Sequence, residues 1–398
     1  MSCYLLGGAQ TDFARNYQRE GLEVSDLVRE VVEGTLAAAR VDTVETIHVG
    51  NAFGQLYNGQ GQLGGMPAQV VPSLRGLPAM RHEAACASGG LAVLSAMAEI
   101  EAGRYDVALV LGVEQEKSVP GDEASRILGA ASWVGHEGAA DYIWPHQFSL
   151  LADEYDARYG LDEQHLSGIA ELNYRNARSN PFAQSRDWRV PDFGRDSEHN
   201  PVIDGRVRRS DCSQITDGGA GVVVASAAYA AAWAKQTGGT PAEIKGWGHR
   251  TVGLSYASKI DRGSEYVLPH VRQTITDAFD RAGIEDVWQL DGIETHDCFT
   301  PSEYMAIDHF GITAPGESWK AVESGILEKD GSIPVNASGG LIGLGHPVGA
   351  TGVRMVLDAS KQVTGQAGDT QVEGARTFGT LNIGGSTTTT VSFVIGAP

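Results

Sequence analysis

A cysteine followed by a glycine pair is the first residue of this chain that could do chemistry. Cys86 lies in the stretch HEAACASGG, and a helical pattern over 92–101 follows it. This spacing places the thiol at the start of a helix, where unpaired N–H groups and the helix dipole favour an anion. A thiol in such a position can have its pKa lowered well below about 8.5 and act as a nucleophile. Taken alone, a buried cysteine that begins a core helix is the simpler interpretation.

A histidine inside the most glycine-rich stretch is the second candidate. The run NASGGLIGLGHPVGATG covers 336–352, and its glycine density indicates a backbone that turns sharply against a close neighbour. His346 stands between Gly345 and Pro347, so a chain stiffened by proline holds its ring. We interpret His346 as a general base for a thiol.

A third cluster stands where an apolar strand ends. The strand predicted over 292–296 leads into His296, Asp297 and Cys298, and Pro301 opens a helix. Open α/β sheets usually bind ligands at the carboxyl ends of parallel strands. For this segment alone, a ligand site and a structural strand end with a buried cysteine fit equally well.

The elements that must position these residues follow an α/β pattern. Apolar runs alternate with amphipathic helical patterns, as in the strand predicted over 46–49 and the helix predicted over 24–39. The alternation stops over about 116–211, where polar and charged residues rise, and it resumes after 217. Such alternation predicts mostly parallel sheets covered by helices.

The same pattern divides the chain into three regions, and the order of elements in the two outer regions suggests a degenerate duplication. The predicted regions are an N-terminal half (1–116 plus 217–238), an inserted loop domain (117–216) and a C-terminal half (239–398).

Composition and charge exclude several classes of protein. The 398 residues carry a net charge of -20, which disfavours nucleic acid as a partner because a phosphate backbone needs a basic face. No apolar run approaches the ~18 residues of a membrane span, and no basic stretch leads a hydrophobic run, so we expect a cytoplasmic protein without a membrane anchor. The four cysteines are scattered and form no CxxC pair, so we expect neither a disulfide framework nor a bound metal.

Taken together, these segments resemble the thiolase superfamily. ACASGG, HDCF and GGLIGLGHPVGATG occur in the family's order with similar spacing, and SQITDGGAGVVVAS is similar to its SGLNDGAAA stretch. The HDCF form resembles the sterol-carrier-protein-type and archaeal-type thiolases. The resemblance implies duplicated thiolase-type α/β halves, with mixed sheets and helices layered α/β/α/β/α, and an inserted loop domain that binds CoA. It implies an acyltransferase that cleaves or forms 3-oxoacyl-CoA through a cysteine thioester, with CoA as substrate and no permanently bound cofactor.

The resemblance also implies a role for each candidate residue. Cys86 would be the acylated nucleophile, His346 would take its proton, and Cys298 would be the second acid/base. His296, with His346, would hold the thioester oxygen. The backbone N–H groups of Cys86 and Gly384 would form a second oxyanion site.

Substrate contacts are expected from the inserted region. Because CoA is polyanionic, the chain needs a local basic patch, and Arg206, Arg208 and Arg209 form its densest basic run. The resemblance implies that Ser213 touches the pantetheine part of CoA. Phe148 is a candidate for lining the acyl pocket.

One position departs from the family pattern and keeps alternatives open. Asn382 stands where the family's CxGGG motif has a cysteine, and an amide cannot shuttle a proton as a thiol does. Cys298 would supply that thiol instead. The alternatives are a superfamily lyase, which cleaves an aldol adduct of a CoA ester and generally lacks the nucleophilic cysteine, a non-catalytic acyl-CoA-binding subunit, and a ketoacyl synthase that uses acyl-carrier protein. The resemblance implies a homodimer or homotetramer and allows a small OB-fold partner protein.

Overall fold

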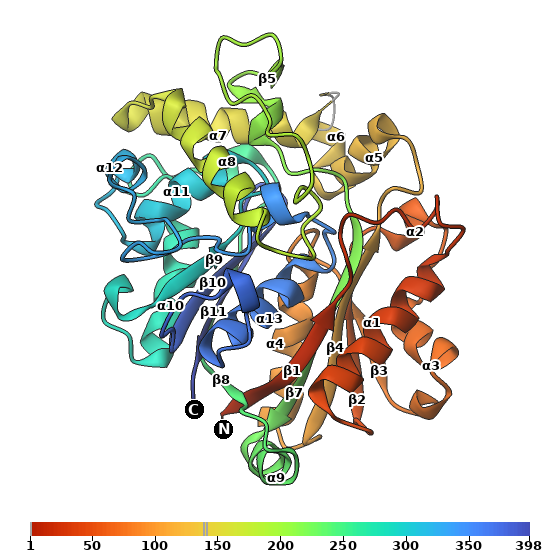
Figure 1. The fold of residues 1–398 in the computed structure, drawn as a ribbon. Coiled ribbons are helices and arrows are strands. Elements are labelled where there is room, and N and C mark those ends of the chain that lie inside the picture. Colours follow the sequence, from red (N-terminus) through yellow and green to blue (C-terminus); the bar gives the residue numbers. More distant parts are fainter. Residues whose placement is uncertain (1, 138–139, 141) are drawn as a thin grey trace.

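A nine-stranded mixed sheet is the centre of the fold in this computed structural model, which describes residues 2–137, 140 and 142–398 (Figure 1). Its strand order is β3-β2-β4-β7-β1-β8-β11-β10-β9. Its strands are β1 (Cys3–Gln10), β2 (Thr46–Gly50), β3 (Ala79–His82), β4 (Val107–Gln115), β7 (Asp217–Ser226), β8 (Ala242–Thr251), β9 (Gly292–Thr295), β10 (Thr377–Gly384) and β11 (Thr389–Gly396).

The two halves of this sheet repeat one arrangement. In the N-terminal half, β2 and β4 are parallel, whereas β4–β7 and β7–β1 are antiparallel. In the C-terminal half, β9 and β10 are parallel, whereas β10–β11 and β11–β8 are antiparallel. The order β2-β4-β7-β1 is therefore repeated as β9-β10-β11-β8, and the halves join through a short β1–β8 ladder. The sheet is mixed, as the resemblance implied; the expectation of mostly parallel sheets was wrong because the central strands β4, β7, β1, β8 and β11 pair antiparallel with one another.

Thirteen α-helices within the described ranges cover the sheet and the site above it. They are α1 (Val24–Ala39), α2 (Gly54–Tyr57), α3 (Met66–Val70), α4 (Ser88–Glu101), α5 (Gly121–Leu128), α6 (Val134–Glu137), α7 (Ile143–Tyr159), α8 (Glu163–Ala177), α9 (Ala227–Thr237), α10 (Pro269–Ala282), α11 (Thr300–Phe310), α12 (Ser318–Ser324) and α13 (Thr351–Val363).

Helices α4 and α13 form the middle layer of the molecule. Both contact strands of the N-terminal and of the C-terminal half, and they contact each other. Helices α1 and α9 cover the outer face of the N-terminal half, and α10 covers that of the C-terminal half. Alternate residues of β4 serve the two faces: Leu109 and Leu111 pack with α1, whereas Ala108 and Val110 pack with α4 and α13. The layering α/β/α/β/α is therefore confirmed.

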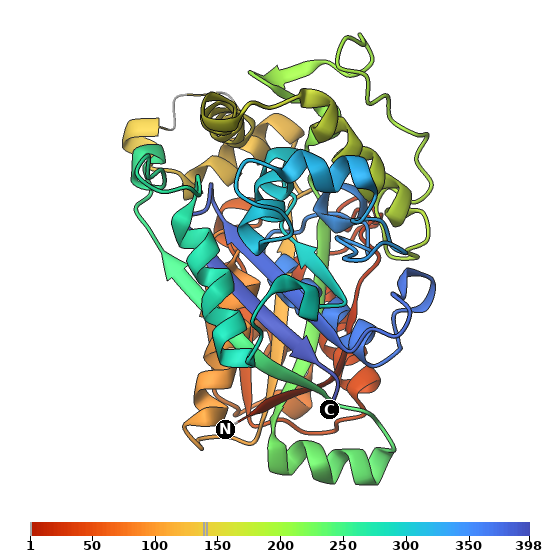
Figure 2. The ribbon, with the colours of Figure 1, turned by 90° about the vertical axis from the view of Figure 1, so that its left-hand side faces the viewer.

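The region between β4 and β7 lies at the end of the molecule opposite to the two termini (Figures 1 and 2). It contains α5 to α8 and a small ribbon of β5 (Val202–Asp204) and β6 (Val207–Arg208). The boundaries predicted for the three regions stay a prediction. Within the described ranges, no helix combines the length and the apolar run that crossing a membrane requires.

The first turns of α4 and α13 touch through their backbones. A Cβ at Gly352 would lie 2.2 Å from the backbone nitrogen of Gly90, and a Cβ at Gly89 would lie 2.8 Å from that of Val353. Neither position has room for a side chain. This close approach brings together the chain segments that precede the two helices, which carry Cys86 and His346.

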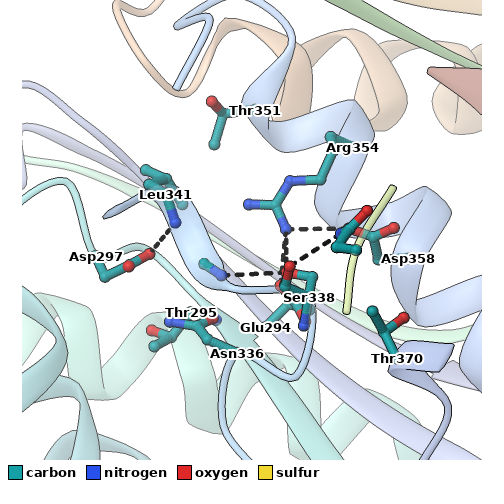
Figure 3. A network of polar contacts seen from close by, with 12 residues as sticks. Glu294, Thr295, Asp297, Asn336, Ser338, Leu341, Thr351, Arg354, Asp358 and Thr370 are labelled. Carbon is teal, nitrogen blue, oxygen red and sulfur yellow. Dashed lines mark hydrogen bonds and ion pairs between the residues drawn. The ribbon is translucent and has the colours of Figure 1, made fainter. Parts of the chain in front are cut away.

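A buried ion-pair network fixes α13 to the C-terminal half (Figure 3). The Arg354 Nη1 atom lies 2.7 Å from Glu294 of β9 and 3.1 Å from Asp358. The same atom donates to the Ser338 hydroxyl at 3.1 Å. Asp297, next to Cys298 along the chain, accepts the backbone N–H of Leu341 in the π-helical turn Gly340–Leu344. Polar contacts thus tie α13, β9 and the glycine-rich run into one unit.

The backbone contact generates a stability prediction for Gly352→Ala. The added methyl group meets the backbone of α4, so the strain exceeds the roughly 1 kcal/mol that alanine gains in helix propensity. We expect the free energy of unfolding to fall by about 1–3 kcal/mol, measured by denaturant titration. In the control Gly65→Ala the new Cβ meets open space, so a change within about 0.5 kcal/mol is expected. Equal effects of the two variants would contradict the close-packing argument.

Candidate active site

Cys86 lies in a strained turn that leads into α4. Ala85 has a φ of 50°, in the left-handed region that disfavours a residue with a Cβ. Ser88 holds the turn, since its hydroxyl accepts the N–H of Ala84 and donates to the carbonyl of Ala85. The helix begins at Ser88, two residues after Cys86 and four residues before the helical pattern over 92–101.

Three predicted catalytic side chains converge at this turn. The Cys86 sulfur and one ring nitrogen each from His296 and His346 all lie within 4.8 Å of one another. The two imidazole rings meet edge to face, with centroids 5.1 Å apart. Cys86, His346 and Cys298 line one cavity of about 680 Å³. A cluster of this composition could also bind a metal ion, so the expectation of no metal stays a prediction.

A threonine missed by the sequence analysis sets the tautomer of His346. The Thr351 hydroxyl lies 2.8 Å from His346 Nδ1 and donates to the Pro347 carbonyl. It therefore accepts from an Nδ1–H, which leaves Nε2 of the neutral ring unprotonated. Burial, and then the charge of Arg354, lowers the pKa of His346 to about 3, so the ring is neutral at physiological pH. The position of this threonine, five residues after the histidine, was the available signal.

Asn382 bridges the nucleophile and the second histidine. Its amide nitrogen donates to the Cys86 carbonyl at 2.9 Å and lies 3.4 Å from His296 Nδ1. His296 thus accepts at Nδ1 and carries its hydrogen on Nε2, which has no partner within the described part of the chain. Burial lowers the pKa of His296 well below its usual value. His296 is therefore a neutral, buried residue beside Cys86 whose Nε2–H can donate to a substrate oxygen. The contacts of Asn382 with Cys86 and His296 give Asn382 a structural role.

The pKa of the Cys86 thiol is raised to about 12, first by burial and then by the Glu116 carboxyl. The lowering expected from a helix start was therefore wrong, because the thiol is enclosed and burial disfavours the thiolate. Backbone N–H groups of Gly385 and of Cys86 itself act on the sulfur in the opposite direction. Gly385 directly follows the predicted Gly384, which pairs with Thr389 at the end of β10, and the oxyanion role of the Gly384 amide stays a prediction.

Cys298 lies in the cavity wall and is 5% exposed. Its sulfur is 4.0 Å from the Ser302 hydroxyl, which in turn donates to the His296 carbonyl. Burial, and then the neighbouring Cys86, raises the pKa of Cys298 well above its usual value. The predicted Ser213 donates its backbone N–H to the Cys298 carbonyl at 2.9 Å and lines the same cavity. Contacts to both its side chain and its backbone therefore hold Cys298 in place.

Of the remaining predicted substrate residues, two lie in the cavity wall. Phe148 stacks on Phe299 at a centroid distance of 4.8 Å, and Arg209 is exposed at the rim. Arg208 does not line the cavity described here, because its guanidinium turns away to donate to the Asn200 carbonyl at 3.0 Å. Arg206 is paired with acidic residues of α7. Of the three arginines in the basic run, Arg209 is therefore the one that lines this cavity.

The threonine contact generates a prediction for Thr351→Val. Without the hydroxyl, His346 loses the acceptor that keeps Nε2 unprotonated and facing the thiol. We expect iodoacetamide to alkylate Cys86 about 10- to 100-fold more slowly at neutral pH, measured by intact-protein mass. Thr351→Ser keeps the hydroxyl and should react at nearly the wild-type rate. An unchanged rate in Thr351→Val would show that the hydroxyl does not orient the base.

Comparisons with known proteins identify the family of this chain. The family descriptions "Thiolase, N-terminal domain" and "Thiolase C-terminal domain-like" match residues 3–191 and 254–397. Acetyl-CoA acetyltransferase of Methanothermobacter thermautotrophicus is 30% identical, over 96% of this chain and 96% of that protein. Sterol carrier protein 2 of Homo sapiens is 25% identical, over 98% of this chain and 71% of that protein.

Solved structures share the fold. The Ltp2-ChsH2(DUF35) aldolase superposes with a TM-score of 0.80 at 19% identity, covering 100% of this chain and 98% of that chain. Human mitochondrial 3-ketoacyl-CoA thiolase in complex with CoA superposes with a TM-score of 0.70 at 19% identity, again covering 100% of this chain and 98% of that chain. The chain belongs to the thiolase family.

Proposed function

We propose that this protein is an acetyl-CoA C-acyltransferase that cleaves or forms 3-oxoacyl-CoA through a thioester on Cys86. The observation that carries the proposal is the convergence of a cysteine thiol with two neutral histidines of opposite tautomer. One ring nitrogen can accept the thiol proton, and the other ring offers an N–H to a carbonyl oxygen. Acyl transfer through a nucleophilic thiol requires both a base for the thiol and a donor for the oxyanion.

In the first half-reaction of thiolysis, His346 Nε2 takes the proton of Cys86. The thiolate attacks the 3-oxo carbon, and the developing oxyanion accepts hydrogen bonds from donors such as the Nε2–H of His296. The carbonyl re-forms, the C2–C3 bond breaks, and its electron pair leaves as the enolate of acetyl-CoA. Cys298 gives that carbon its proton and becomes a thiolate.

The second half-reaction restores every group. The Cys298 thiolate takes the proton of an incoming CoA thiol, and the CoA sulfur attacks the acyl carbon on Cys86. The thioester oxygen is held by His296 and by His346, which is now protonated and can donate. The backbone N–H groups of Cys86 and Gly384 form the second oxyanion site and donate to the acyl oxygen as negative charge develops on it. Cys86 leaves as a thiolate and recovers its proton from His346.

The expected assembly extends this proposal. We propose a homodimer or homotetramer, with the edge strand β3 as the candidate contact because Met80 on it is 40% exposed. Light scattering measures the mass, and a monomer would contradict the assembly. A small OB-fold partner and a cytoplasmic location stay predictions.

The mechanism predicts different losses for the cysteines of the cavity. Cys86→Ala should abolish both acylation by acetyl-CoA, read by intact-protein mass, and thiolysis of acetoacetyl-CoA by CoA. Cys298→Ala should still form the acyl-enzyme but lose thiolysis by about 10²–10⁴-fold, since it lacks the acid/base. Cys212 also lines the cavity, and Cys212→Ala should stay near wild type. Near-normal thiolysis in Cys298→Ala would move the second acid/base elsewhere, and no turnover by the wild type would refute the function.

The basic run yields a second prediction, in which the structure separates two adjacent arginines. Arg209→Gln removes a cation at the cavity rim and should raise the KM for CoA about tenfold with little change in kcat, since a charged hydrogen bond is lost. Arg208→Gln should leave the KM nearly unchanged, because that side chain faces Asn200. Steady-state kinetics with varied CoA decide between them. A larger rise in KM for Arg208→Gln than for Arg209→Gln would assign the CoA phosphates to Arg208 instead.

A further inference from the structure

A carboxyl group that the mechanism does not use lies in the wall of the catalytic cavity. Glu116 directly follows β4 and is 1% exposed, and it lines the cavity with Cys86 and His346. Glu114, two residues earlier, is also buried, but its oxygens accept backbone N–H groups of Ala52 and Phe53 away from the cavity. The sequence signal was this pair of acids with strand spacing at the end of an apolar strand.

Two hydrogen bonds fix the orientation of Glu116. Its Oε1 accepts the backbone N–H of Val348 at 2.8 Å, and its Oε2 accepts that of Thr216 at 3.3 Å. The Thr216 hydroxyl accepts the backbone N–H of His346 at 3.0 Å. The carboxyl is therefore held at the point where the loop of the base and the end of the inserted region meet the cavity.

The charge around Glu116 favours its neutral form. Glu114 and Asp217 act on it with negative charge, which together with burial outweighs the positive charge of the adjacent Lys117 and the two backbone N–H bonds. No ion pair to Glu116 occurs among the described residues. Burial, and then Glu114, raises the pKa of Glu116 well above its usual value. As a carboxylic acid it carries an O–H and can donate a hydrogen bond, which a carboxylate cannot do.

The cavity around this acid is large and partly apolar. Its volume of about 680 Å³ is shared by the CoA arm beside Ser213 and the acyl group beside Phe148. Its wall includes Phe53, Leu128, Ile215 and Val348. A plain alkyl chain in this space would bury Glu116 without satisfying its O–H, at a cost of about 1–3 kcal/mol. A substrate carboxylate would be repelled by the carboxylate of Asp122, which also lines the cavity, while Arg209 in the same wall is proposed to bind the phosphates of CoA.

We propose that Glu116 selects 3-oxoacyl groups bearing an uncharged oxygen, a hydroxyl or a carbonyl, farther along the acyl chain, by donating a hydrogen bond to that oxygen. This inference rests on the proposed function and names the substrate class of the same site. Glu116 acts on specificity. The bond chemistry is carried by Cys86 together with His296, Cys298 and His346.

Three CoA thioesters of equal chain length test the proposal: 3-oxohexanoyl-CoA, 5-hydroxy-3-oxohexanoyl-CoA and 3-oxoadipyl-CoA. For the wild type we expect kcat/KM to favour the hydroxylated substrate over the other two by about 10- to 100-fold. Glu116→Leu should bring the hydroxylated-to-plain ratio close to one, whereas Glu116→Gln keeps an N–H donor and most of the preference. Glu123→Gln, on α5 outside the cavity lining, should leave the ratio unchanged.

We compare the ratios of the kcat/KM values because weaker hydrogen bonds between residue 116 and its neighbouring loops would lower kcat/KM for all three substrates together. A wild-type preference near one, or a preference that survives Glu116→Leu, overturns the proposal. If the wild type cleaves none of the three substrates, the proposed function fails, and selectivity is then measured by calorimetric binding of S-hexyl-CoA and S-(5-hydroxyhexyl)-CoA. Tighter binding of the hydroxylated thioether by about tenfold, lost in Glu116→Leu, supports the role of Glu116; equal binding overturns it.

Discussion

The contact between the backbones of α4 and α13 is the constraint on which the rest of the structure depends. Each helix belongs to one half of the duplicated sheet, and each begins directly after a segment that carries a reactive side chain. A single Cβ at Gly89 or Gly352 would push the helices apart. Since the distances in the site are a few ångströms, a displacement of even one methyl group would separate the thiol from its base. The glycines are therefore part of the catalytic geometry, although none of them reacts.

Duplication of the halves produces a site that is not symmetric. The N-terminal half contributes the nucleophile, whereas the C-terminal half contributes both histidines, Cys298 and the bridging Asn382. The region between β4 and β7 then adds Phe148, Arg209 and Ser213 to the cavity wall. One scaffold thus places the proposed nucleophile on one side and the proposed proton-transfer groups on the other. Because these groups come from separate segments, their alignment depends on the shared middle layer.

The second feature of the site is that its central side chains are uncharged in the free protein. Burial disfavours the charged form of each central group, so the thiol stays protonated and both rings stay uncharged. The nearby cation, Arg354, is matched by Glu294 and Asp358 and keeps its charge within the buried network. In the proposed mechanism, charge therefore appears in the site when Cys86 transfers its proton to His346, and the N–H donors for the oxyanion that follows are already in place.

The sequence by itself determined the α/β halves, the family and the identity of the central residues. Strand and helix periodicity are local, and the segments around Cys86, His346 and Cys298 are readable as motifs. Only the tertiary structure decided how these residues work together. Asn382 meets Cys86 across 296 positions of the chain, and the same packing set the tautomer of His346, raised the pKa of the thiol and turned Arg208 away. Hydrogen-bond partners, burial and electrostatic surroundings arise when distant segments pack, so no local pattern specifies them.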